Sequence, residues 1–223
     1  MDYYPITIIN DFYEDPFKVR EFALSQEFKF LHEIEDYGHV FPGSRTKDLS
    51  TIDQLFFQKV CEKLTSIFHN YDYDKMRWSI TSSFQSVTSE YNSGVIHQDS
   101  DTVFAGVLFL SPNPEFHSGT SLFKENKTFN LEKYQEALKE NDLKFKKNQK
   151  ISYDYHQMFD EILTVQNVFN SLILYEGQHY HAANNFFGNS KETSRLTQVF
   201  FVKRVDAQKE SNFPVIRVKK IST

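Results

Sequence analysis

Three short segments in the second half of the chain carry side chains whose types and spacing could do chemistry. They are His97-Gln98-Asp99, Tyr180-His181 and Arg195-Leu196-Thr197. Residues two apart in a strand point to the same face, so His97 and Asp99 would present an imidazole and a carboxylate together. His181 could complete the set with a second imidazole. Two histidines and one carboxylate on one face of a metal ion are a ligand set typical of non-haem Fe(II), and they leave the opposite coordination positions open.

A His-x-Asp tripeptide alone is a weak signal, because it occurs by chance in many proteins as a surface histidine beside a solvated acid. The surrounding sequence strengthens the hypothesis of a metal site. Residues 91–99 read YNSGVIHQD, and the apolar run 103–110 ends in a Pro-Asn-Pro turn before SGTSLF. Further along, NSLILYEGQHYHAANNFFG leads into TSRLTQVFFV. The order of these pieces is more informative than the tripeptide.

In this order the segments resemble the Fe(II)- and 2-oxoglutarate-dependent dioxygenases, particularly the prolyl-4-hydroxylase-like branch. The resemblance spans about residues 78–203. It implies that His97, Asp99 and His181 bind iron and that Arg195 binds the distal carboxylate of 2-oxoglutarate. Thr197 points to the same strand face as Arg195, so its hydroxyl could hydrogen-bond to the same carboxylate.

The resemblance also implies an activity. An enzyme of this kind uses Fe(II), the cosubstrate 2-oxoglutarate and O2, forms succinate and CO2, and would hydroxylate an amino-acid, peptide or small-molecule substrate. Two other functions stay open, namely a jelly-roll protein that binds another divalent metal ion for different chemistry, and a non-catalytic jelly-roll binding module. The complete set of His97, Asp99, His181 and Arg195 argues against the non-catalytic module, because a decayed site should have lost at least one member.

The distal histidine has a rival. His179 and His181 lie two residues apart and could share one strand face. We favour His181, because the segment AANNFFG that follows it fits the way in which the chain leaves that strand in the family. The gap from His181 to Arg195 is 195 − 181 = 14 residues, longer than the commonest family spacing, and the loop at 184–193 would have to absorb the excess.

From Trp78 onward the hydrophobic pattern has a period of two, which is typical of half-buried strands. The successive candidate strands are 79–91, 96–99, 103–110, 120–123, 167–175, 178–182 and 193–203. Turn signals such as Asn92-Ser93-Gly94 separate them. Many short strands of this kind predict a mainly β fold with flanking helices, built on a double-stranded β-helix (jelly-roll) core over about residues 76–205.

Helices are expected in two other parts of the chain. Residues 1–75 should form a helical support, with a short strand at 6–9, one helix starting at Asp15-Pro16 and another near Thr51, in a capping box. Residues 126–166 interrupt the strand pattern and are expected to be a helical insertion, with helices at 131–147 and 155–163. Such an insertion could act as a lid that selects the substrate.

Arg45 follows a Pro-Gly turn in the segment FPGSRTKD. An arginine in this position could face a substrate, but we expect a turn-stabilising or solvated role.

Composition limits the partners and the setting. The 223 residues include 25 basic and 30 acidic ones, so the formal charge of −5 offers no broad cationic surface for nucleic acid. Cys61 is the only cysteine and cannot form an internal disulfide, and the N-terminal segment MDYYPITIIND has an early acid and no basic-then-apolar signal pattern. The longest apolar run, 103–110, is too short to span a membrane. We therefore expect a single soluble, cytoplasmic domain over residues 1–223, of unknown oligomeric state.

Overall fold

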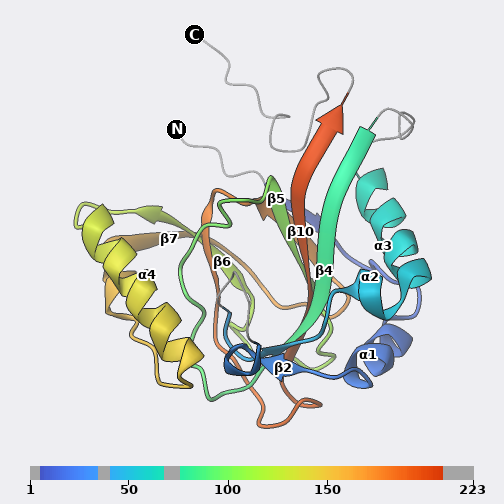
Figure 1. The fold of residues 1–223 in the computed structure, drawn as a ribbon, viewed down its shortest axis with the longest axis horizontal. Coiled ribbons are helices and arrows are strands. Elements are labelled where there is room, and N and C mark those ends of the chain that lie inside the picture. The colour runs from blue at the N-terminus through green and yellow to red at the C-terminus, as the bar shows by residue number, and fades with distance from the viewer. Residues whose placement is uncertain (1–5, 35–40, 68–75, 208–223) are drawn as a thin grey trace.

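The structure, a computed structural model, describes residues 6–34, 41–67 and 76–207, and two antiparallel sheets form its centre (Figure 1). The seven-stranded sheet has the order β1 (Ile6–Ile9), β8 (Leu172–Glu176), β5 (Phe104–Phe109), β10 (Arg195–Ala207), β4 (Met76–Val87), β3 (Ser44–Arg45) and β2 (Lys29–Phe30). The three-stranded sheet has the order β7 (Phe159–Val165), β6 (Thr120–Glu125) and β9 (Tyr180–Ala183). The predicted mainly β fold with flanking helices is confirmed.

The N-terminal part of the chain is more than a helical support. Its strand β1 pairs with β8 at one edge of the large sheet, and its strands β2 and β3 extend the other edge beside β4. Sequence periodicity missed β2 and β3 because each has only two residues. Their positions depend on pairing with distant strands.

Three helices from this part lie together on one side of the large sheet (Figure 1). They are α1 (Pro16–Leu24), α2 (Leu49–Ile52) and α3 (Gln54–Ser66). The side chain of Asp15 caps α1, as predicted. The predicted start at Thr51 is wrong, because Asp48 caps α2 and the chain then turns extended at Asp53, which caps α3. Aspartate is a stronger helix cap than threonine, which explains the shifted start.

Alternate residues of β10 face opposite sides of the large sheet, as strand geometry requires. Leu196, Phe200 and Val202 are buried in the core that α1 and α3 cover. Arg195 and Val199 line a pocket on the other face. The sheet thus separates an apolar core from a concave face that carries polar side chains.

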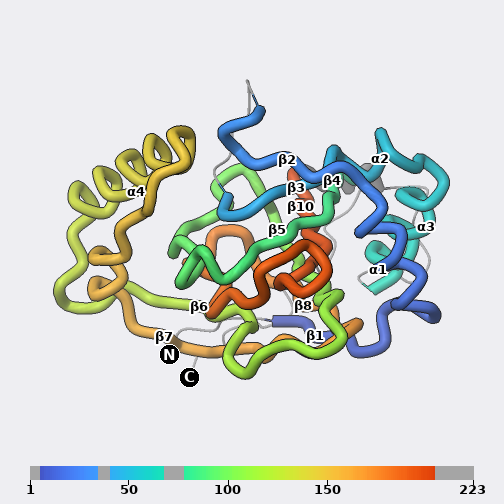
Figure 2. Tube along the Cα trace, turned by 90° about the horizontal axis from the view of Figure 1, so that it is seen from below, coloured from blue at the N-terminus to red at the C-terminus, as the bar shows by residue number. Residues whose placement is uncertain are grey.

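The insertion between β6 and β7 lies on the opposite side of the molecule from α1 to α3 (Figures 1 and 2). Its helix α4 (Leu131–Lys146) agrees with the prediction, and the side chain of Asn130 caps it. The second predicted helix, at 155–163, is wrong. A short 3-10 helix at Asp154–Met158 is followed by β7, which pairs with β6. Pairing with a distant strand overrides local preference in such segments.

No helix in the described part of the chain is long and apolar enough to span a membrane.

Candidate metal centre

The His-x-Asp segment is held against β9 by backbone hydrogen bonds. The N–H of His97 donates to the carbonyl of His181 (3.1 Å), and the N–H of His181 donates to the carbonyl of His97 (3.0 Å). The N–H of Asp99 donates to the carbonyl of Gly177 at 2.7 Å. The strand predicted at 96–99 is therefore reduced to an isolated bridge. This bridge places two segments that are distant in sequence side by side.

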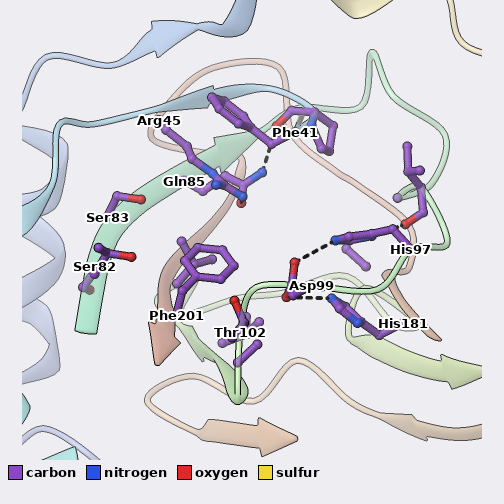
Figure 3. A pocket seen from close by; sticks show the side chains of 18 of the residues that line it. Phe41, Arg45, Ser82, Ser83, Gln85, His97, Asp99, Thr102, His181 and Phe201 are labelled. Carbon is purple, nitrogen blue, oxygen red and sulfur yellow. Dashed lines mark hydrogen bonds and ion pairs between the residues drawn. The ribbon is translucent and has the colours of Figure 1, made fainter. Parts of the chain in front are cut away.

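The side chains of His97, Asp99 and His181 converge on one point, with one ligand atom of each within 4.8 Å of the others. Nε2 of His97 lies 3.5 Å from Oδ1 of Asp99, and Nε2 of His181 lies 3.4 Å from Oδ2 (Figure 3). No other group of three histidine, cysteine or acidic side chains in the described residues meets this criterion. The structure thus brings together the three predicted ligands.

The other nitrogen of each ring fixes its tautomer. Nδ1 of His97 lies 2.8 Å from the carbonyl oxygen of Val95, and Nδ1 of His181 lies 2.8 Å from that of His179. A carbonyl can only accept, so both Nδ1 atoms carry a proton, and the lone pair of each neutral ring is on Nε2. Histidine ligands in metal sites are oriented in the same way.

The charges in this cluster also suit a cation. Burial raises the pKa of Asp99, but His181 and His97 outweigh this effect and hold the pKa well below its usual range. Burial lowers the pKa of His97, but hydrogen bonding and charge from Asp99 outweigh it and raise the pKa. An ionised carboxylate therefore faces two imidazoles. Metal ligands must be deprotonated, and an ionised carboxylate beside two Nε2 lone pairs meets this condition, so the residues fit a divalent ion.

His179 lies outside the cluster. It precedes β9, and its Nε2 lies 3.5 Å from Oε2 of Glu176. Burial is the largest cause of the lowered pKa of His179. The structure thus places His181, and not His179, beside His97 and Asp99.

Arg195 begins β10 and is 3 % exposed. Its Nε donates to the carbonyl of Ser118 (2.8 Å), and its Nη2 donates to the carbonyl of Gly119 (3.1 Å) and to the hydroxyl of Thr120 (3.3 Å). The backbone at Gly119 lies close to the end of β7, where a Cβ on residue 119 would be 1.8 Å from the carbonyl oxygen of Val165. Only glycine allows these two backbone segments to approach so closely.

The charge of Arg195 has no acidic partner among the described residues, and its Nη1 makes no hydrogen bond to them. Burial lowers the pKa of Arg195 to about 10, so the guanidinium keeps its charge at neutral pH. A buried charge without a partner is unfavourable. The site is therefore suited to an anion that supplies the missing charge.

Thr197 follows Arg195 on the same face of β10, as the strand period predicted. The residue is fully buried, and its hydroxyl has no hydrogen-bond partner in the described part of the chain. Such hydroxyls are uncommon in protein interiors. This unused group is consistent with a polar ligand next to Arg195.

Tyr175, on β8, is a site residue that the sequence analysis missed. Its ring centroid lies 4.6 Å from that of His181, and the side chain lines the same pocket. Burial and the charge of Asp99 raise its pKa, whereas the charge of Arg195 opposes this rise. The phenol therefore lies within electrostatic reach of both the carboxylate cluster and the buried arginine. A tyrosine at the end of the apolar run SLILY was the available signal.

One pocket of about 880 Å³ is lined by His97, Asp99, Tyr175, His181 and Arg195, whereas Thr197 is not among its lining residues. Arg45 lines it as well, so the expected turn-stabilising or solvated role is wrong. Its Nη2 donates to Oε1 of Gln85 at 3.0 Å, and its guanidinium lies 4.2 Å from the centre of the Phe41 ring. Pairing of β3 with β4 aligns Arg45 with Gln85 and directs it into the pocket, across from His181 (Figure 3). Helix α4 adds Leu138 and three further residues to the wall.

Comparison with solved structures shows that the chain has the fold of Fe(II)/2-oxoglutarate oxygenases. HygX from Streptomyces hygroscopicus with nickel and 2-oxoglutarate bound is 11% identical, with a TM-score of 0.52 over 92% of this chain and 84% of that one. EvdO2 from Micromonospora carbonacea var. aurantiaca, complexed with 2-oxoglutarate, is 10% identical, with a TM-score of 0.53 over 93% and 90%. An oxidoreductase of the 2OG-Fe(II) oxygenase family from Burkholderia pseudomallei is 9% identical, with a TM-score of 0.50 over 91% and 86%. The predicted jelly-roll core and the resemblance in fold are confirmed.

No curated protein matches the sequence at a significant level. A match to a defined protein family does exist, and it extends over residues 2–202, which include every element of the site. The chain belongs to this family, the family of unknown function DUF6445.

Proposed function

We propose that this protein is a non-haem Fe(II)- and 2-oxoglutarate-dependent oxygenase. One observation carries the proposal, namely that the His97–Asp99–His181 cluster shares a pocket with Arg195, a buried cation that has no acidic partner among the described residues. The cluster alone would fit several divalent ions. The buried charge of Arg195 favours an anion beside that metal, and 2-oxoglutarate is an anion that also binds a metal.

In this proposal His97, Asp99 and His181 hold Fe(II) through Nε2, a carboxylate oxygen and Nε2. When bound, the metal supplies the oxidation of a substrate C–H bond by O2, with conversion of 2-oxoglutarate to succinate and CO2. Arg195 binds the distal carboxylate of 2-oxoglutarate through Nη1, while the hydrogen bonds of Nε and Nη2 to the protein hold the guanidinium in orientation.

Two hydroxyl groups support the same end of the cosubstrate. Thr197 lies on the face of β10 that carries Arg195, and its buried hydroxyl can donate to a carboxylate oxygen. The phenol of Tyr175 is within electrostatic reach of both Asp99 and Arg195 and stays protonated, because burial raises its pKa. It can therefore act as a donor at any physiological pH.

The primary substrate occupies the rest of the pocket. A volume of about 880 Å³ is near the upper end of the usual range for small-molecule sites. It leaves room for an amino acid, a peptide side chain or a small metabolite beside 2-oxoglutarate. Hydroxylation is the reaction that we propose for it.

The decisive experiment adds Fe(II) and 2-oxoglutarate to the protein without oxygen. We expect the weak visible charge-transfer band of the iron chelate, at one iron per chain. His97→Ala serves as the matched control and should show no band. A folded parent protein that gives no band under these conditions would refute the proposal, and binding of another divalent ion alone would favour different metal chemistry.

A further inference from the structure

The backbone of Ile96, immediately before His97, faces away from β9. His97 directs both its N–H and its carbonyl to His181. In an antiparallel pair the next residue along the strand directs its backbone groups to the opposite edge. In a regular sheet another strand would satisfy them there. Ile96 is completely buried, so water cannot take that place.

Two phenol groups from the insertion take the place of the missing strand. The N–H of Ile96 donates to the hydroxyl oxygen of Tyr155 at 2.9 Å. The carbonyl of Ile96 accepts from the hydroxyl of Tyr134 at 3.3 Å, and the hydroxyl of Tyr155 lies 3.5 Å from the same oxygen. Tyr134 belongs to α4, and Tyr155 belongs to the 3-10 helix that follows it. Both side chains are buried.

The same insertion contacts the neighbours of both histidines. Ile96 and Ala182, which adjoin His97 and His181, are buried in one aromatic cluster with Tyr134, Tyr155 and Phe159. Since side chains alternate along an extended chain, each histidine points into the pocket while its neighbour points into this cluster. A third phenol, of Tyr153, donates to the carbonyl of Ser93 at 2.9 Å.

We propose that the insertion positions the metal ligands, and that the hydroxyls of Tyr155 and Tyr134 fix the location of His97 through the backbone of Ile96. The inference rests on the proposed function, because it takes the His97–Asp99–His181 cluster to be a metal site. It gives the insertion a role other than that of a lid. Tyr134 and Tyr155 are positioning residues, since neither is among the side chains that line the pocket.

Loss of the Tyr155 hydroxyl would leave a buried N–H without a partner, and the segment would have to shift to satisfy it. His97 has no regular strand on that side to keep it in place. Metal affinity depends steeply on such supporting contacts, which typically account for 10- to 100-fold. Replacement of tyrosine by phenylalanine keeps the ring in the aromatic cluster and removes only the hydroxyl.

The test compares Tyr155→Phe and Tyr134→Phe with the parent protein and with Tyr13→Phe. The hydroxyl of Tyr13 donates to Oε1 of Gln198 at 2.6 Å, so the control also removes a hydrogen-bonded phenol, but outside the pocket. Titration with Co(II), followed by visible absorption, gives the metal affinity and the ligand geometry. Amide hydrogen exchange of the metal-free proteins reports whether residues 93–99 are held.

We expect Tyr155→Phe to bind Co(II) roughly 10- to 100-fold more weakly, with an altered spectrum and faster exchange at 93–99. Tyr134→Phe should show a smaller effect, because its hydrogen bond is longer. Tyr13→Phe should match the parent in Co(II) affinity and in exchange at 93–99. If Tyr155→Phe does not fold, Tyr134→Phe decides the question with the same readouts.

Equal Co(II) affinity and equal spectra in the parent and both site variants would overturn the inference and leave the proposed function intact. A folded parent that binds no Co(II) would instead refute the metal site itself. In that case, unchanged exchange at 93–99 in Tyr155→Phe would show separately that the phenols do not hold the segment.

Discussion

Nδ1 of His181 lies 2.8 Å from the carbonyl oxygen of His179, so one of the two rival histidines holds the ring of the other in place. The contact uses only the backbone of His179. The side chain of His179 points elsewhere and contacts Glu176. The two residues therefore make separable contributions, one through a side chain in the cluster and one through the main chain.

The first prediction follows from this division. His181→Ala should lose stoichiometric iron, whereas His179→Ala should keep most of it, because alanine preserves the carbonyl that accepts from Nδ1. Iron content after anaerobic loading and desalting measures both variants. Loss of iron in His179→Ala with retention in His181→Ala would mean that the β9 register is shifted by one pleat.

The second prediction concerns the other two ligands. His97→Ala and Asp99→Ala should each abolish stoichiometric iron binding without unfolding the domain, because neither side chain belongs to an apolar core cluster. Far-ultraviolet circular dichroism and thermal unfolding of the metal-free proteins serve as the folding control. Unchanged iron content in both variants would rule out the cluster as a metal site.

Much of this site could be predicted because its signals are local. The order of the His-x-Asp tripeptide, the distal histidine and Arg195 can be read along the chain, and the period of two marks the strands that carry them. The features that were missed depend on contacts between distant segments. Arg45 faces the pocket because of pairing between β3 and β4, and β7 is a strand because of pairing with β6. Tyr155 contacts Ile96 although the two residues are 59 positions apart in the sequence, so only the tertiary fold shows this contact.

The third prediction concerns pH. Burial lowers the pKa of His156, in the insertion, to about 4, against about 6.5 in an unfolded chain. Between these values the unfolded state binds more protons, so the free energy of unfolding should fall as the pH falls through this range. The titration of His156 should lower the free energy of unfolding by about 2 kcal/mol between pH 7 and pH 5.

His156→Phe tests this assignment, because phenylalanine keeps a ring against Tyr153 and Tyr155 but cannot take up a proton. Urea unfolding of the metal-free proteins at pH 7 and pH 5 gives, for each protein, the change in the free energy of unfolding between the two pH values. The variant should lose about 2 kcal/mol less than the parent over this interval. Identical losses in the two proteins would show that His156 is not the group that titrates.

The last prediction tests the anion site. A buried charged hydrogen bond contributes about 1.5 to 3 kcal/mol, so Arg195→Leu should weaken 2-oxoglutarate binding roughly ten- to hundredfold. Arg195→Lys should recover part of the loss, since it keeps the charge without the planar fork. Thr197→Val should have a smaller effect than either, because it removes one neutral hydroxyl. Anaerobic titration of 2-oxoglutarate into the iron-loaded variants measures all three.

Arg195 also donates to the carbonyls of Ser118 and Gly119, so its replacement could act through the fold and not through the ligand. Arg20→Leu is the matched control, because Arg20 donates to the carbonyls of Leu110 and Glu192 but does not line the pocket. Arg20→Leu should leave the 2-oxoglutarate affinity unchanged even where it lowers stability. Iron affinity should hardly change in any of these variants. If Arg195→Leu bound 2-oxoglutarate as tightly as the parent, the anchor would have to be another cation of the pocket, and Arg45 and Lys203 would be the first to replace.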